Sequence, residues 1–224
     1  MDALIFDFDG VIVDSEPVHL ATFQEVLRGE GINLSHDDYY EKYLGFDDYD
    51  CFKNVGKDYG KPFTQEKINQ LTQAKTLLVL KEFQTSVTAL PGAIELIKQA
   101  AQTGVPMAIC SGSLRQEILA ASTAIGVRDC FQIIIAAQDV QKGKPDPEGY
   151  RLAIQQLAPF AKSGPEPAKT VVIEDSPAGI ESAKAIGIQV LAVSTSYPVS
   201  ELSDADRIVT SLADITPADL NQMI

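Results

Sequence analysis

Five short and almost uninterrupted apolar runs constrain the fold of this chain more than any other feature of its sequence. They lie at residues 3–6, 106–110, 133–136, 170–173 and 189–193, and β-branched residues are common in them. Strands without polar alternation are usually buried on both faces, as in parallel sheets covered by helices on both sides. The runs therefore predict the strands of a buried parallel sheet.

Helical spacing of apolar residues fills the gaps between the later runs. It extends over residues 94–101, 118–125, 152–157 and 180–186, and Pro177 stands where a first helical turn would begin. Strands and helices that alternate in this way predict an α/β fold with a Rossmann-like parallel sheet.

The segment from residue 15 to residue 88 interrupts this alternation. It consists of helix-like stretches without a convincing buried strand, and it is rich in acidic and aromatic residues. We therefore predict a small α-helical cap domain at residues 15–88, inserted into a catalytic core formed by residues 1–14 and 89–224. A chain of 224 residues is long enough for such a division.

The net charge of −13 argues against two classes of partner. Nucleic acids and anionic membrane surfaces are repelled by such a field, so we expect neither as a partner. A small phosphorylated metabolite remains compatible with this charge, because one divalent cation and one lysine can reverse the local sign inside a cleft. The start of the sequence resembles no export signal, no apolar stretch is long enough to span a membrane, and the three cysteines form no CxxC pair. We expect a cytoplasmic protein with reduced thiols.

Two carboxylates follow directly after the first apolar run, in the sequence Asp7-Phe8-Asp9-Gly10. Their i, i+2 spacing can direct both side chains into one cleft, while Phe8 points elsewhere. Ligands of open α/β sheets bind beyond the carboxyl ends of the strands, which is where these aspartates lie. Taken alone, an Asp-rich turn is more often a solvated turn or a helix cap.

Four separated segments resemble the motifs of the haloacid dehalogenase superfamily in their order and distances. They are residues 7–14, Ser111 with Gly112, Lys144 within Gly143-Lys144-Pro145-Asp146-Pro147, and Glu174 with Asp175. Each lies near the end of a predicted strand, and the helical insert resembles the cap of this superfamily. Residues 10–16 resemble the β-phosphoglucomutase-like branch in particular. A DxDG motif alone would be weak, whereas the ordered set is specific.

The resemblance implies phosphoryl transfer through a covalent aspartyl phosphate. Asp7 would be the nucleophile, and Asp9 would protonate the leaving oxygen and later take a proton from the attacking water. Ser111 and the Gly112 amide would bind the phosphoryl oxygens, while Lys144 would supply positive charge.

The resemblance also implies Mg²⁺ as the cofactor. The implied ligands are the carboxylates of Asp7 and Asp175 and the main-chain carbonyl of Asp9, with Glu174 bound directly or through water. Hard oxygen ligands of this kind suit Mg²⁺.

Several of these residues have ordinary structural alternatives. Ser111 can end a strand or cap the helix that begins near Leu114, although Ser113 is better placed as that cap. Lys142 competes with Lys144 for the cationic role. Glu174 and Asp175 can cap the helix that Pro177 begins, and Cys110 is expected to be a small buried strand residue.

His19 is the remaining candidate, as a possible cap or hinge residue. A single histidine on a helix is usually a packing or surface residue, yet its spacing from Asp14 resembles that of the β-phosphoglucomutases.

These observations favour a phosphatase of small phosphorylated metabolites, such as sugar phosphates. A β-phosphoglucomutase-type mutase is the alternative, weakened because the acidic segment 44–48 replaces the arginine with which such mutases grip a second phosphate. A catalytically silent ligand-binding module is a third hypothesis, disfavoured by the complete set of motif residues. We expect a monomer or a weak homodimer.

Overall fold

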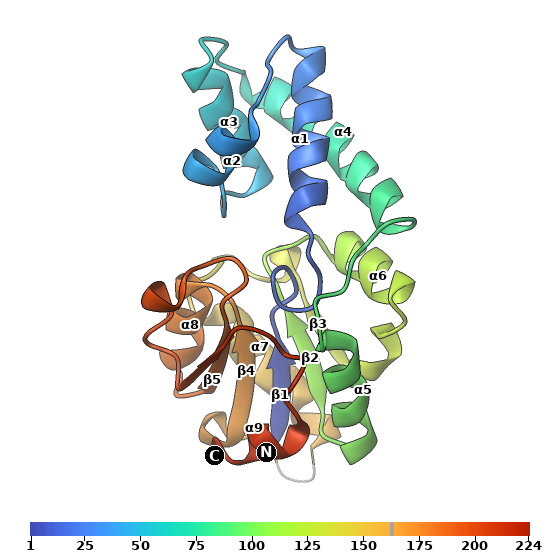
Figure 1. The fold of residues 1–224 in the computed structure, drawn as a ribbon, viewed down its shortest axis with the longest axis vertical. Coiled ribbons are helices and arrows are strands. Elements are labelled where there is room, and N and C mark those ends of the chain that lie inside the picture. The colour runs from blue at the N-terminus through green and yellow to red at the C-terminus, as the bar shows by residue number, and fades with distance from the viewer. Residues whose placement is uncertain (162–163) are drawn as a thin grey trace. The chain divides into compact units, whose positions relative to one another are not determined.

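The fold is shown in Figure 1 by a computed structural model, which describes residues 1–161 and 164–224. The chain forms two compact units, a sheet unit of residues 1–14 and 87–224 and a helical unit of residues 15–86. The second boundary lies two residues before the predicted one at residue 88. The assignment of the helical unit as a cap stays a prediction.

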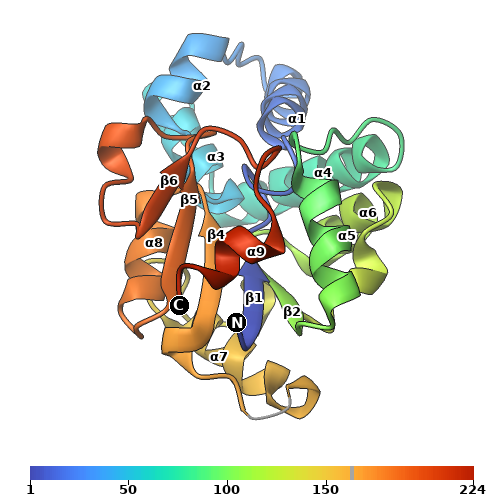
Figure 2. The same ribbon diagram turned by 60° about the horizontal axis from the view of Figure 1, so that its bottom comes forward.

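The sheet unit is built on six parallel strands in the order β3-β2-β1-β4-β5-β6. Figure 2 shows β4, β5 and β6 side by side. The strands are β1 (Ala3–Phe6), β2 (Met107–Cys110), β3 (Ile133–Ile135), β4 (Thr170–Glu174), β5 (Gln189–Val193) and β6 (Arg207–Val209). Five of them coincide with the apolar runs. The short β6 was not predicted, because its three residues include a charged one and are only half-buried.

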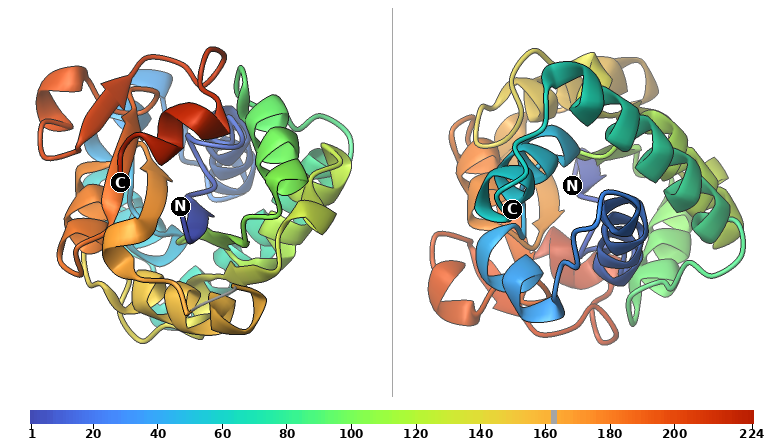
Figure 3. Two further views of the ribbon diagram at one scale, coloured as in Figure 1. Left: turned by 90° about the horizontal axis from the view of Figure 1, so that it is seen from below. Right: turned by 90° about the horizontal axis from the view of Figure 1, so that it is seen from above.

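Helices cover both faces of this sheet, as the view from below in Figure 3 shows. Helices α7 and α8 pack on one face, where their apolar side chains join the core formed by β1, β2, β4 and β5. Helices α5, α6 and α9 lie on the other side. Their bounds are α5 (Ala93–Thr103), α6 (Arg115–Ala124), α7 (Glu148–Leu157), α8 (Pro177–Lys184) and α9 (Pro217–Asn221).

The burial of the central strands explains their sequence. All four residues of β1 are fully buried, and all five residues of β4 are buried as well. A strand that meets apolar side chains on both faces has no position for an alternating polar residue. The predicted α/β, Rossmann-like fold is confirmed.

The helical unit contains α1 (Glu16–Gly29), α2 (His36–Lys42), α3 (Asp48–Asp58) and α4 (Gln65–Phe83). Three of these helices begin with a side-chain cap, because Ser35, Asp47 and Thr64 each accept a hydrogen bond from the amide three residues later. Its core is separate from that of the sheet and includes Phe23 and Phe52, whose ring centroids lie 5.0 Å apart. The unit thus has its own apolar centre.

In the part of the chain that the structure describes, every helix is too short or too polar to cross a membrane. The expected cytoplasmic location stays a prediction.

Candidate active site at the carboxyl end of the sheet

The strand register brings the predicted motifs to one level at the carboxyl edge of the sheet. Phe6, the last residue of β1, is paired with Ile109 of β2 and with Ile173 of β4. Asp7, the first residue after β1, and Glu174, the last residue of β4, therefore lie side by side at this edge. The strand order reverses at β1, because β2 and β3 lie on one side of it and β4 to β6 on the other. In doubly wound sheets ligands bind at the carboxyl edge where the order reverses.

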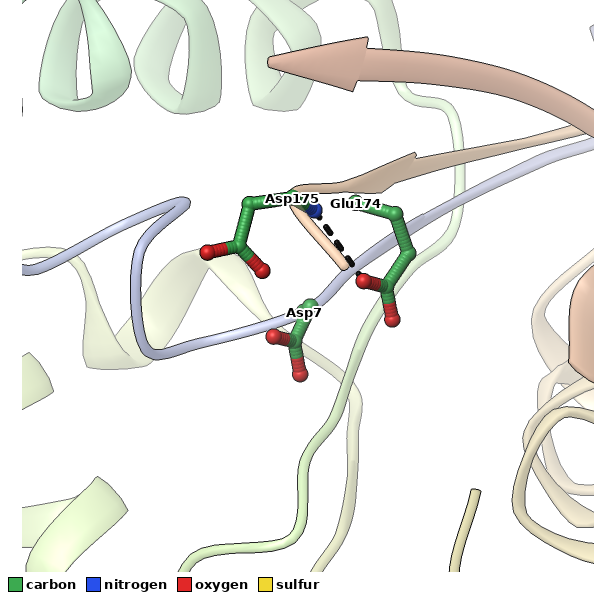
Figure 4. Close-up of side chains that lie close together, drawn as sticks. All are labelled: Asp7, Glu174 and Asp175. Atoms are coloured by element: carbon green, nitrogen blue, oxygen red, sulfur yellow. Dashed lines mark hydrogen bonds between the residues drawn. The ribbon is translucent and has the colours of Figure 1, made fainter. Parts of the chain in front are cut away.

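Three carboxylates converge at this edge, as Figure 4 shows. Asp7, Glu174 and Asp175 each place one oxygen within 4.8 Å of the others, and all three side chains are buried. Buried carboxylates at such separations repel one another unless cations lie among them. We call these three residues the acidic cluster.

Lys144 is the lysine that reaches the acidic cluster. Its Nζ donates to Oδ1 of Asp7 at 2.7 Å and to Oε1 of Glu174 at 2.5 Å. The side chain of Lys142, the alternative of the sequence analysis, is 76% exposed and lies 4.0 Å from Asp146. The structure thus places Lys144, and not Lys142, beside Asp7.

Glu174 is held by donors on both of its oxygens. Oε1 accepts from Lys144 and from the hydroxyl of buried Tyr150, whereas Oε2 accepts from the amides of Asp175 and Ser176 and from the Ser176 hydroxyl. Gly179 makes this packing possible, because a Cβ atom there would overlap the Glu174 carboxylate. A carboxylate with this many donors is a better brace for the cluster than a direct metal ligand.

The helix-cap alternative for Glu174 and Asp175 is wrong. The N-cap of α8 is Ser176, whose hydroxyl accepts from the Gly179 amide at 3.1 Å.

Burial has the largest single effect on the pKa values of the acidic cluster. It raises the pKa of Asp7 well above its ordinary value, although Lys144 opposes the shift, and it raises the pKa of Asp175 to about 7. Burial also acts to raise the pKa of Glu174, but Lys144 and the hydrogen bonds outweigh it and the pKa is lowered. Burial acts to lower the pKa of Lys144, yet the neighbouring carboxylates Asp7 and Glu174 raise it above its ordinary value. The lysine stays charged and does not balance the three acids.

Asp9 lies next to the loop that follows β2. Its Oδ2 accepts from the hydroxyl of Ser111 at 3.3 Å and also from the hydroxyl of Ser113, while the Ser113 amide donates to the Ser111 oxygen at 2.9 Å. Gly112 lies between the two serines and is exposed. The expected helix cap at Ser113 is wrong, because α6 has Leu114 as its N-cap and the Ser113 hydroxyl binds Asp9 instead.

A loop beyond β5 completes the edge of the site. The Ser196 hydroxyl donates to Oδ2 of Asp175, and the Thr195 hydroxyl donates to the carbonyl oxygen of Gly10. Gly10 has φ 72°, and a Cβ atom there would collide with the Asp175 carboxylate. The turn after β1 therefore requires glycine at this position.

Sequence reasoning missed the roles of Tyr150, Ser176 and Ser196. Two of them had usable signals: Ser176 directly precedes Pro177, as an N-cap does, and Ser196 follows a predicted strand at the same edge. Tyr150 reaches Glu174 from the first turn of α7 and reads in the sequence as an ordinary core aromatic.

His19 lies on α1 in the helical unit. Its Nδ1 is 3.0 Å from Nζ of buried Lys75, and its ring packs edge-on against Phe83 with the centroids 6.1 Å apart. These contacts are all within the helical unit, and the hinge role stays a prediction. Cys110 is buried as expected, and burial raises the pKa of its thiol to about 12.

The donors of the acidic cluster suit a hard divalent cation. The carboxylates of Asp7 and Asp175 supply oxygen atoms, and the three acids outnumber the one lysine among them. A bound cation would oppose the burial and the neighbouring negative charges that together raise the pKa values of Asp7 and Asp175. The residues therefore fit the expected metal.

Comparison with known proteins assigns the chain to a family. The family model described as haloacid dehalogenase-like hydrolase matches residues 4–193. The chain belongs to this family. The predicted membership of the superfamily is thereby confirmed, and the solved structure of a β-phosphoglucomutase from Clostridium difficile, 20% identical to this chain, shares its fold.

Two curated relatives of this haloacid dehalogenase-like hydrolase span nearly its whole length. Validoxylamine A 7'-phosphate phosphatase of Streptomyces hygroscopicus subsp. limoneus is 29% identical over 212 residues, covering 94% of each chain. Hexitol phosphatase A of Escherichia coli is 30% identical and covers 95% of this chain and 92% of its own. Among solved structures, CbbY from Rhodobacter sphaeroides in complex with phosphate superposes with a TM-score of 0.87 at 24% identity, covering 99% of both chains. That likeness shows the shared fold.

Proposed function

We propose that this haloacid dehalogenase-like hydrolase is a Mg²⁺-dependent phosphoric monoester hydrolase of small phosphorylated metabolites of the sugar or polyol phosphate class. The observation that supports this best is the contact of Lys144 with Asp7 inside an acidic cluster. A nucleophilic carboxylate, a fixed positive charge and an excess of oxygen ligands are what phosphoryl transfer needs at one point.

Asp7 attacks the phosphorus atom in this proposal. One of its oxygens forms a bond to phosphorus while the bond from phosphorus to the leaving oxygen breaks, and water later hydrolyses the aspartyl phosphate. The Lys144 ammonium lies 2.7 Å from Oδ1 of Asp7, close enough to favour the ionised nucleophile and to attract the phosphoryl oxygens. The Ser111 hydroxyl and the Gly112 amide bind those oxygens.

Asp9 acts as the acid/base partner. It protonates the leaving oxygen in the first step and takes a proton from water in the second. Its place beside the Ser111 hydroxyl, which is assigned to the phosphoryl group, supports this role.

Mg²⁺ would be held by the carboxylates of Asp7 and Asp175 and by the main-chain carbonyl of Asp9. When bound, it supplies positive charge that screens the phosphoryl oxygens from the carboxylates. Glu174, whose oxygens already accept several hydrogen bonds, takes part through water or by bracing Lys144.

The relatives support the proposed substrate class. One is named for a phosphate ester of validoxylamine A and the other for hexitol phosphates, and both cover nearly all of this chain. A monomer or weak homodimer in the cytoplasm is part of the same proposal.

The mutase alternative lacks a specific observation in its favour. Such an enzyme must hold a second phosphate while the intermediate reorients, and segment 44–48 offers carboxylates for that purpose. Asp47 caps α3 and Asp48 pairs with Lys75, so the helical unit uses both acids locally. The silent-module alternative is disfavoured by the contact between Asp7 and Lys144.

The test is phosphate release from a panel of sugar, polyol and other phosphate monoesters with and without Mg²⁺. We expect release that depends on Mg²⁺ and is lost in Asp7→Asn, while the matched control Asp37→Asn, whose side chain is 89% exposed, keeps full activity. Interconversion of hexose 1- and 6-phosphates with little release would favour the mutase. Inactivity of the folded, Mg²⁺-supplied protein on the whole panel would contradict the proposal.

A further inference from the structure

Ser113 has a role that differs from the one its sequence position indicates. The residue precedes a helix, where a serine hydroxyl usually caps the free amides of the first turn. The N-cap of α6 is instead Leu114, and the Ser113 hydroxyl donates to Oδ2 of Asp9. The Ser113 hydroxyl therefore binds a carboxylate outside the helix instead of capping α6.

The two hydroxyls on Asp9 are not equivalent. Ser111 accepts from the Ser113 amide at 2.9 Å and directs its own proton to Oδ2 of Asp9 at 3.3 Å. A hydroxyl has a single proton to donate. If Ser111 donates it to a phosphoryl oxygen, as proposed above, its bond to Asp9 is lost. Ser113 is then the hydroxyl that still holds Oδ2.

The backbone around Ser113 is anchored to the neighbouring strand. The Ser113 carbonyl accepts from the amide of Ala137, just beyond β3, at 3.1 Å, and the Ser111 amide donates to the carbonyl of Ile135 at 3.0 Å. Two hydrogen bonds to one segment fix this loop on both sides of Gly112. The Ser113 hydroxyl is therefore presented to Asp9 from a fixed position.

We propose that Ser113 is a positioning residue for Asp9, and this inference rests on the proposed function. With Oδ2 accepting from Ser113, the transferable proton of Asp9 resides on Oδ1. During attack, Asp7 forms its bond to phosphorus, the electron pair of the breaking bond goes to the leaving oxygen, and that oxygen takes the proton from Oδ1. Ser113 orients the carboxyl for this transfer and touches neither phosphorus nor the leaving group.

Two esters that differ in their need for a proton distinguish this role from a structural one. An alkyl phosphate such as a hexitol phosphate has a poor leaving group and needs general-acid help, whereas p-nitrophenyl phosphate departs readily without it. For Ser113→Ala we expect kcat/KM to fall about 10- to 100-fold on the alkyl ester and less than about threefold on the aryl ester. Ser113→Thr keeps the hydroxyl, so its kcat/KM on the alkyl ester should lie within about threefold of the wild-type value.

The same pair of esters links Ser113 to Asp9. Asp9→Asn should show the same preference for the aryl ester, and adding Ser113→Ala to it should cause no further loss, because residues that act as a unit are not additive. Ser211→Ala is the matched control, since its hydroxyl accepts an exposed hydrogen bond from the Ala213 amide, and it should leave both rates unchanged.

Equal losses on both esters, no loss on either, or a fully additive double variant would overturn the inference while leaving the proposed function intact. Absence of Asp7-dependent phosphate release from both esters in the wild-type protein would overturn the proposed function, and the role of Ser113 with it. The two failures are therefore distinguishable in one set of assays.

Discussion

Two lysines, Lys144 in the sheet unit and Lys75 in the helical unit, form similar ion pairs with different consequences. In the sheet unit, Lys144 faces Asp7 and Glu174, with Asp175 in the same cluster. In the helical unit, Lys75 is 1% exposed and pairs with one carboxylate, Asp48, at 2.5 Å. Lys75 also lies 4.3 Å from the centroid of the Phe23 ring.

The difference lies in the balance of charge. Around Lys75 one ammonium contacts one carboxylate, a ring nitrogen of His19 and the face of Phe23, so its charge is satisfied within the helical unit. Around Lys144 three buried carboxylates share one ammonium, and the pKa values of Asp7 and Asp175 are raised as a result of burial and mutual repulsion. A balanced pair stabilises its surroundings, whereas an unbalanced cluster is suited to bind a cation and a phosphoryl group.

Removal of Lys144 should have the largest effect on activity. Lys144→Ala deletes the fixed positive charge beside the proposed nucleophile, so we expect kcat/KM for phosphate release to fall about 10³-fold. Steady-state kinetics with saturating Mg²⁺ measures this. Lys142→Ala is the matched control and should change kcat/KM less than about twofold, because its side chain is 76% exposed. Comparable losses in the two variants would remove the distinction between these lysines.

The next largest effect should come from replacing a glycine, and its size should differ between the two units. Gly179→Ala places a Cβ atom on the Glu174 carboxylate, and we expect it to lower the free energy of unfolding by about 2–4 kcal/mol. Gly29→Ala, also in a helix but with no atom within 4 Å of the added Cβ, should be neutral or stabilising by up to about 1 kcal/mol. Denaturant titration of both variants checks this. If Gly179→Ala left the free energy of unfolding unchanged, the packing around Glu174 would not be rigid.

Loss of the ion pair between Lys75 and Asp48 should lower the stability of the protein rather than its activity. Lys75→Met keeps the volume but leaves Asp48 without its lysine, and we expect a loss of about 2 kcal/mol, moderated because the Asp48 side chain is 24% exposed. Adding Asp48→Asn should recover part of this loss. Thermal unfolding measures both variants. A fall in kcat/KM on the folded Lys75→Met protein as large as that of Lys144→Ala would show that the two lysines belong to one functional site.

The smallest expected effect is the pH dependence of stability without metal. The folded protein keeps a proton on Asp175 up to about pH 7, whereas the unfolded chain releases it near its ordinary pKa of 3.8. The folded state therefore binds more protons between these values, and stability should fall as pH rises across this window. Mg²⁺ competes with those protons, so it should raise Tm by about 5 °C at pH 8 and by less at pH 5. Scanning calorimetry with Mg²⁺ or with EDTA tests this, and an equal Mg²⁺ effect at both pH values would contradict it.

Much of the sheet unit follows from its sequence because burial on both faces leaves a strong signal. The apolar runs predicted β1 to β5, and the motif positions at their ends predicted which side chains share the edge. The short β6 leaves no comparable signal, because Arg207 and its neighbours are only half-buried.

The partners of the motif residues were harder to predict than the motifs. Tyr150 and Ser196 approach the cluster from elements whose orientation depends on tertiary packing, which local patterns do not encode. Ser113 was interpreted as a helix cap because capping rules use only the adjacent sequence, which does not show that Asp9 lies across the loop. The pairing of Lys75 with Asp48 joins residues 27 positions apart, beyond the reach of helical spacing.

The most direct test of the central claim is to look for the phosphoryl group on Asp7. The protein is mixed with a hexitol phosphate and Mg²⁺, quenched in acid within the first turnover, digested, and analysed by mass spectrometry. We predict one phosphoryl group on the peptide that contains Asp7, absent in Asp7→Asn and in samples with EDTA. Rapid phosphate release with no phosphoryl group on that peptide, or with the group on another side chain, would contradict the account.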